Sequence, residues 1–207
     1  MKTIAFVCQK GGTGKTTLAI SLATAAIVDG LSVAVVDLDS QVSACEWSDI
    51  RQADMPVVID AQPARIDAVA ERARDTGIDL LLIDTAGRTE QSALAGARAA
   101  NLVFVPLQPS VIDLKAFRAT MNLLDLAECK HRIAVLMRVK PFGRRHEETT
   151  QWLENQGMPV CPVCIGDRIA FQDAYAQGRG VSEIVAGGKA AIEIQEVYKY
   201  TKEQVGF

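Results

Sequence analysis

A glycine-rich segment near the N-terminus constrains this chain more than any other feature. A short apolar run, Ile4 to Cys8, leads into the string Lys10-Gly11-Gly12-Thr13-Gly14-Lys15-Thr16-Thr17, and a stretch of helical length follows. Glycines let a backbone turn tightly and direct N–H groups at an anion, and the next helix adds the positive end of its dipole. We therefore expect this loop to bind a nucleotide, with Lys15 reaching its β and γ phosphates and the Thr16 hydroxyl ligating Mg²⁺. The alternative is a glycine turn that only packs between strand and helix.

The rest of the chain alternates between two patterns. Stretches of helical period, ended by glycines such as Gly30 and Gly77, separate short runs rich in Val, Ile and Leu. Continuous apolar runs are typical of strands buried on both faces of a parallel sheet. We predict a doubly wound α/β domain over residues 1–207, with a mostly parallel sheet, helices on both faces and ligands outside the carboxyl ends of the strands. The predicted strands are Ile4 to Cys8, Val33 to Val36, Leu80 to Ile83, Leu102 to Val105 and Ile133 to Met137.

The composition says little about binding partners, but it indicates the cellular compartment. The net charge is -3, so any nucleic-acid surface must be a local basic patch. Five scattered cysteines in a chain of 207 residues indicate reduced thiols in a cytosol rather than a disulfide scaffold. We find no signal-peptide pattern, no apolar run long enough to cross a bilayer and no cationic amphipathic tail, so we expect a cytoplasmic protein without a membrane role.

Acidic residues end two of the predicted strands. Asp37 and Asp39 lie two residues apart, so both side chains leave the same side of a strand end, where two like charges need a cation or water. Asp84 ends the run from Leu80 to Ile83, and an acid placed there, facing the phosphate loop, holds Mg²⁺ directly or through water. The residues Asp39-Ser40 are also suited to start a helix near Val42.

The phosphate loop departs from the ordinary pattern in an informative way. That pattern requires glycine five residues before Gly14, where this chain has Gln9. The string from Lys10 to Thr17 instead resembles the deviant Walker A loop of the ParA/MinD superfamily. In that family two subunits sandwich two nucleotides, and the lysine that matches Lys10 reaches the phosphates in the partner subunit. The resemblance implies an ATP-dependent homodimer, in which Lys10 and Lys15 stabilise charge on the transferring phosphoryl group. The alternative for Lys10 is a solvated loop lysine.

The resemblance extends along the N-terminal half, from Lys2 to Gly87, and more loosely through residues 103–110. The segment Val35 to Gln41 is similar to the family motif V-D-x-D-x-Q, which implies that Asp39 positions the attacking water and that Asp37 lies near the metal. Leu80 to Gly87 is similar to Walker B, with Asp84 as its acid. Because Gly87 allows movement, Thr85 to Glu90 is the predicted γ-phosphate-sensing switch.

ATP is expected rather than GTP, because the Asn-Lys-x-Asp signature that reads guanine is absent after the strand Ile133 to Met137. The residues that follow this strand, including Arg138, are predicted to border the base. The residues around Cys161-Pro162-Val163-Cys164 are also predicted to border the base. Arg138 and Pro162 are therefore the candidate base contacts.

Within the superfamily, the chain resembles the small partition ATPases that lack a fused specific-DNA-binding domain. That resemblance implies weak intrinsic ATPase activity stimulated by an adaptor protein, and an ATP-bound dimer that binds DNA without sequence preference and so associates with the nucleoid. Phosphate contacts need clustered basic residues, although charged loops are often only solvated. The candidate DNA-binding residues are Arg138, Lys140, Arg144, Arg145 and Arg168.

Two other functions remain open from the sequence. Cys161 and Cys164 have the spacing of a pair that shares a metal or iron–sulfur cluster between subunits, as in the carrier and reductase branch. Two sulfurs per chain are few, however, and the run Val160 to Ile165 has the pattern of a buried strand whose thiols pack as small hydrophobes. A metabolic ligase is the other alternative, but we find no distinct motif for a small-substrate pocket.

Overall fold

The centre of the molecule is a parallel sheet. The computed structural model describes residues 1–87 and 89–206, with the backbone alone for residues 111–115. In this part of the chain six parallel strands have the order β3-β2-β4-β1-β5-β6, which confirms the predicted fold class. The strands are β1 (Lys2–Phe6), β2 (Val33–Asp37), β3 (Val57–Asp60), β4 (Leu80–Asp84), β5 (Leu102–Leu107) and β6 (Arg132–Leu136).

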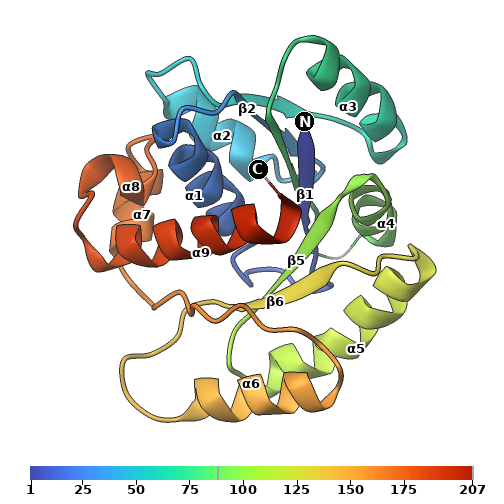
Figure 1. Cartoon of the computed structure of the whole chain (residues 1–207), viewed down its shortest axis with the longest axis vertical. Coiled ribbons are helices and arrows are strands. Elements are labelled where there is room, and N and C mark those ends of the chain that lie inside the picture. The colour runs from blue at the N-terminus through green and yellow to red at the C-terminus, as the bar shows by residue number, and fades with distance from the viewer. Residues whose placement is uncertain (88, 207) are drawn as a thin grey trace.

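Helices cover both faces of the sheet (Figure 1). Within the described residues, α1, α7, α8 and α9 lie on one face and α3, α4 and α5 on the other, while α6 packs beside the edge strand β6. No helix in this part of the chain is long and apolar enough to span a membrane. The helices are α1 (Lys15–Val28), α2 (Ser43–Ile50), the 3₁₀ turn η1 (Pro63–Arg65), α3 (Ile66–Asp75), α4 (Glu90–Ala99), α5 (Val111–Leu126), α6 (Arg145–Asn155), α7 (Ala170–Tyr175), α8 (Val181–Ile184) and α9 (Lys189–Val205).

The central strands are buried on both sides, which explains their unbroken apolar sequences. In β1, Ile4 and Phe6 belong to the core under α1 and α9, whereas Ala5 belongs to the core on the opposite face. The order of the strands reverses around β1, because β4 and β2 lie on one side of it and β5 and β6 on the other. Ligands of doubly wound sheets bind at such a switch point, outside the carboxyl ends of the strands. The glycine-rich loop leaves the sheet at this point.

Two segments differ from the sequence prediction. The edge strand Val57–Asp60 was not predicted, because it has four residues and its side chains are largely exposed. The run Val160 to Ile165 was predicted as a buried strand but is not one: only Val160 forms an isolated bridge, to Ala134. Pro162 interrupts any ladder there, since proline has no N–H to donate.

Candidate nucleotide site

The loop after β1 has the geometry of a phosphate cradle. Gly14 precedes the first residue of α1 with φ of 102°, a backbone conformation that side chains other than glycine adopt only with strain. The Lys15 side chain is buried, and its Nζ donates to the carbonyl oxygen of Lys10 at 3.0 Å and approaches that of Cys8 at 3.5 Å. The lysine is therefore folded back along the loop, with its ammonium held at the cradle by backbone carbonyl oxygens.

Two neighbouring strands brace this loop. Gln108, which follows β5, donates from Nε2 to the carbonyl oxygen of Gly12 at 2.7 Å. The side chain of Met137, which follows β6, packs beside Gly14. This role of the Gln108 side chain could not be predicted, because a single glutamine after a strand carries no recognisable motif.

Thr16 and Asp84 meet at the carboxyl edge of the sheet. The Thr16 hydroxyl donates to Asp84 Oδ2 at 2.5 Å, and Asp84 Oδ1 is buried without a hydrogen bond from the described residues. Burial raises the pKa of Asp84 to about 7, and the nearby charge of Asp37 acts in the same direction. A buried carboxylate oxygen without a partner is costly. A hydroxyl and a carboxylate are hard oxygen donors that suit Mg²⁺, so these two residues fit a magnesium ion.

Asp37 is buried and supports the backbone of the neighbouring loop. Its Oδ1 accepts the N–H of Asp39 at 2.9 Å, and its Oδ2 accepts the N–H of Ala44 at 2.8 Å. Burial raises the pKa of Asp37, while these N–H groups act against that rise. Because Oδ1 holds the loop at Asp39 and Oδ2 holds the first turn of α2, the contribution of Asp37 seen here is to loop structure.

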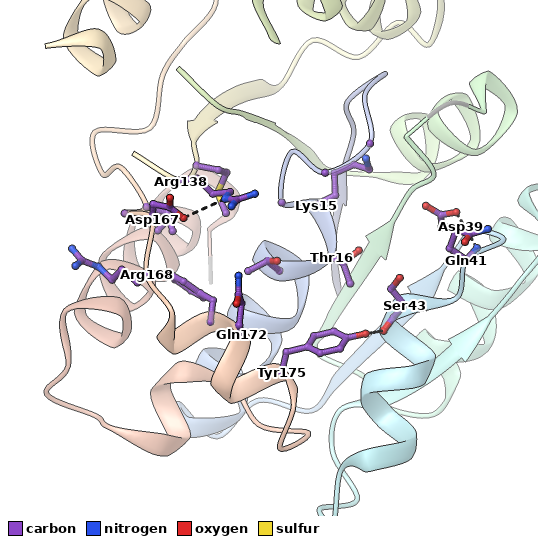
Figure 2. Close-up of a pocket in the computed structure, with 18 residues that line it drawn as sticks. Lys15, Thr16, Asp39, Gln41, Ser43, Arg138, Asp167, Arg168, Gln172 and Tyr175 are labelled. Carbon is purple, nitrogen blue, oxygen red and sulfur yellow. Dashed lines mark hydrogen bonds and ion pairs between the residues drawn. The ribbon is translucent and has the colours of Figure 1, made fainter. Parts of the chain in front are cut away.

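Asp39 lies at the edge of a cavity of about 520 Å³ at the carboxyl ends of the strands. Its Oδ1 accepts the N–H of Gln41 at 3.1 Å. The phosphate loop forms the floor of the cavity, and Figure 2 shows Asp39 on the opposite side of Lys15 and Thr16 from Arg138. The structure thus brings Lys15, Thr16 and Asp39 together around one cavity, as the sequence predicts.

The far wall of the cavity comes from the C-terminal third of the chain. Arg138 lines it with φ of 53°, and its Nε lies 3.3 Å from Asp167 Oδ1 (Figure 2). Pro162 is exposed and is not part of this wall; the neighbouring segment from Ile165 to Arg168 is. Phe171, Gln172 and Tyr175 of α7 complete the lining and were missed, because nothing in their spacing distinguishes them from a surface helix.

The predicted switch segment, Thr85 to Glu90, begins against the phosphate loop. A Cβ atom built on Gly87 would lie 2.7 Å from the backbone nitrogen of Gly11 and 2.8 Å from the carbonyl carbon of Lys10. Only glycine fits this approach without displacing backbone. Arg88, inside the segment, lies outside the described residues.

Three of the five predicted DNA-binding arginines and lysines are engaged with acids. Arg138 pairs with Asp167 and Arg144 with Glu147 at 2.7 Å. Arg168 pairs with Glu193 of α9, and its side chain points away from Lys15 (Figure 2). The remaining two, Lys140 and Arg145, are exposed.

Cys161 and Cys164 have the features of cysteines that pack as small apolar side chains. Cys161 is buried, Cys164 is partly buried, and both are free thiols. Burial raises the pKa of Cys161 to about 11, which opposes the thiolate form that metals require. These observations favour packing over cluster ligation.

The chain is similar to known proteins along most of its length. The chain is 28% identical to the maintenance of carboxysome distribution protein A of Gloeobacter kilaueensis, over 99% of this chain and 94% of the relative. It is 30% identical to protein virC1 of Rhizobium rhizogenes, over 85% of this chain and 79% of the relative. The solved structure of the Pyrococcus furiosus cell division ATPase MinD shares the fold, with a TM-score of 0.80, 19% identity and 98% of each chain covered.

A family model places these likenesses in one group. The model described as the CobQ/CobB/MinD/ParA nucleotide binding domain matches residues 4–181, a range that contains the phosphate loop, Asp39, Asp84 and the far wall of the cavity. This is the superfamily that the deviant phosphate loop predicts. The chain therefore belongs to the CobQ/CobB/MinD/ParA family of nucleotide-binding domains.

Proposed function

We propose that this protein is an ATPase whose nucleotide-dependent dimerisation drives the segregation or positioning of a cargo. The observation that carries the proposal is the meeting of Lys15, the Thr16–Asp84 pair and Asp39 around one cavity. These groups supply the cation, the metal ligands and the water-orienting acid that phosphoryl transfer to water requires.

Each side chain has a distinct role in the proposed hydrolysis. The N–H groups of the phosphate loop and Lys15 bind the β and γ phosphates and stabilise the charge that develops between them. Asp39, at the cavity edge, accepts a hydrogen bond from the attacking water and orients it. Lys10 acts across the dimer, on the nucleotide of the partner subunit, as the resemblance implies.

Thr16 and Asp84 would hold Mg²⁺ beside the phosphates. The ion would neutralise charge on the β and γ oxygens. In support, a solved structure of MinD from Pyrococcus horikoshii, which shares the fold with a TM-score of 0.79, is described as a complex with Mg-ADP. Asp37 then supports the site by fixing the loop that carries Asp39.

The far wall of the cavity is the proposed site of the adenine. Arg138 and Asp167 lie there, on the opposite side of the phosphate loop from Asp39 (Figure 2). The arginine offers a planar group for stacking on the base, and the carboxylate offers an acceptor for its exocyclic amine.

The names of the relatives support a segregation or positioning role. They include ParA of Rhizobium radiobacter, the chromosome-partitioning ATPase Soj of Thermus thermophilus and the carboxysome distribution protein. A solved MinC:MinD complex of Aquifex aeolicus has the same fold, with a TM-score of 0.82. We propose a cytoplasmic protein whose ATP-bound dimer binds DNA without sequence preference, and whose slow hydrolysis is stimulated by an adaptor protein and resets the cycle.

The DNA-binding part of the proposal is tested by removing Lys140 and Arg145, the two exposed candidates that are not paired with an acid among the described residues. In Lys140→Ala/Arg145→Ala, binding of the ATP-loaded protein to random duplex DNA is expected to fall by about tenfold or more. The slope of log affinity against log salt should fall by about two, since each residue contacts one phosphate. Fluorescence anisotropy with a labelled duplex at several salt concentrations measures both quantities.

The matched control is Arg72→Ala/Arg74→Ala, which removes two exposed charges from α3 and should leave DNA binding unchanged. An equal loss in both double variants would show that only net charge matters. Wild-type binding that is equally strong without nucleotide, or absent at low salt, would remove DNA from the proposal.

A further inference from the structure

Tyr175 connects the two walls of the nucleotide cavity. It is the last residue of α7, lines the cavity, and donates from its hydroxyl to the carbonyl oxygen of Ser43 at 2.6 Å. Ser43 begins α2, so the hydrogen bond joins segments that are 132 residues apart in sequence. Figure 2 shows the ring reaching from α7 to Ser43, which lies on the same side of the cavity as Asp39.

The loop before Ser43 contains a strained residue and is held by hydrogen bonds from neighbouring segments. Val42 has φ of 45°, a left-handed conformation that is unfavourable for a β-branched residue. Its N–H donates to the carbonyl oxygen of Asp39 at 2.9 Å, so the strained turn runs directly from Asp39 to Ser43. Asp37 holds this turn from the sheet side, through the N–H groups of Asp39 and Ala44. Within the described hydrogen bonds, Tyr175 holds it from the cavity side.

Further contacts tie α2 to the segment that follows Tyr175. Arg51, just after α2, forms a two-pronged ion pair with Glu183 of α8, at 2.6 and 2.9 Å, and donates to the carbonyl oxygen of Gly178 at 2.9 Å. Burial opposes ionisation of Glu183, but hydrogen bonds from Arg51 and from the N–H of Gly180 outweigh it and lower the pKa of Glu183. The Trp47 indole donates to the carbonyl oxygen of Arg179 at 3.3 Å. These contacts do not use the Tyr175 hydroxyl, so removing that hydroxyl releases the Asp39 turn without detaching α2 from α7 and α8.

We propose that Tyr175 is a positioning residue for ATP hydrolysis, acting through the Ser43 carbonyl to hold Asp39 in its water-orienting place. The inference rests on the proposed ATPase function and adds a residue to it. It also means that the wall contacted by the nucleotide and the loop that orients water move as one unit.

The test compares Tyr175→Phe with wild type in steady-state ATP hydrolysis. Loss of one hydrogen bond that positions a catalytic group is expected to lower kcat about fivefold. The KM for ATP should change by less than about twofold, since the ring and the phosphate loop remain. Tyr198→Phe is the matched control, because it removes a tyrosine hydroxyl bonded to Asp29, which follows the end of α1 distant from the phosphate loop. It should leave kcat unchanged.

A double variant distinguishes the positioning of Asp39 by Tyr175 from a nonspecific structural effect of the substitution. If Tyr175 acts through Asp39, adding Tyr175→Phe to Asp39→Ala should leave the residual single-turnover rate unchanged. A further fivefold loss in the Asp39→Ala background, a wild-type kcat in Tyr175→Phe, or loss of ATP binding by that variant would each overturn the inference. Failure of Asp39→Ala itself to slow hydrolysis would instead contradict the proposed function, so the two failures are distinguishable.

Discussion

Replacing Lys15 by methionine is expected to lower ATP hydrolysis at least about a hundredfold, the scale of losing one preorganised charge-stabilising donor at a reaction centre. The Lys15 side chain is buried, and its ammonium is held at the phosphate loop by the carbonyl oxygens of Lys10 and Cys8. Methionine keeps an unbranched apolar stem of similar length but removes the charged amine. Phosphate release at saturating Mg-ATP measures the rate, and binding of a fluorescent ATP analogue measures the affinity, which should also fall.

Lys2→Met provides the control for this substitution. Lys2 is the first residue of β1, at the opposite end of the strand from the phosphate loop. The control should keep the wild-type rate. A Lys15→Met variant that hydrolyses ATP within threefold of wild type would show that the lysine does not contact the transferring phosphate.

Adding one methyl group at Gly87 is expected to reduce hydrolysis by about a hundredfold, because a shift of roughly 1 Å in a catalytic group has that scale of effect. The new Cβ would meet the backbone of Gly11 and Lys10, at 2.7 and 2.8 Å, so either the phosphate loop or the switch segment must move. Overpacking of this kind also costs about 1–3 kcal/mol of folding free energy. Hydrolysis assays and thermal denaturation of Gly87→Ala measure the two effects.

Gly187→Ala adds the same methyl where nothing lies within 4 Å and should be silent in both assays. The comparison isolates the contact between the two loops from the general effect of replacing a glycine. Wild-type hydrolysis by Gly87→Ala would show that this close approach has no part in the catalytic cycle.

The fold could be predicted where side chains are buried on both faces of the sheet. Runs such as Leu80 to Ile83 are apolar throughout because each residue faces a core, and glycines at turns mark where helices end. The edge strand Val57–Asp60 escapes this reasoning since its side chains face solvent. The segment around Pro162 has the apolar composition of a strand, but composition alone does not reveal the missing ladder.

The candidate site could be predicted only where its functional residues belong to short sequence motifs. Lys15 and Thr16 belong to the motif after β1, and Asp84 is the last residue of β4, so their meeting at one edge of the sheet follows from the fold. Tyr175 and Asp167 belong to the same cavity but arrive from the C-terminal third, and their places depend on how α7 packs. Tertiary packing of this kind leaves no local pattern in the sequence.

The acidic partners of the basic residues could not be predicted from the sequence either. Arg168 is matched by Glu193, 25 residues later, and Arg138 by Asp167, 29 residues later. Neither partner is a sequence neighbour on the same helix face, so a basic residue in a loop cannot be assigned to solvent, to DNA or to an internal acid from its position alone. Because three of the five candidates are paired with acids in the structure, the DNA-binding prediction rests on Lys140 and Arg145.

The most direct test of the central claim, a switch that works by ATP-dependent assembly, is size-exclusion chromatography of Asp39→Ala and Lys10→Ala with Mg-ATP, before and after random duplex DNA is added. Asp39→Ala is expected to bind ATP but to hydrolyse it poorly, so it should elute at twice the mass of a monomer and shift further with DNA. Lys10→Ala should stay monomeric, because it removes the lysine that we propose reaches the partner's nucleotide. An Asp39→Ala protein that remains a monomer at saturating Mg-ATP would contradict the account.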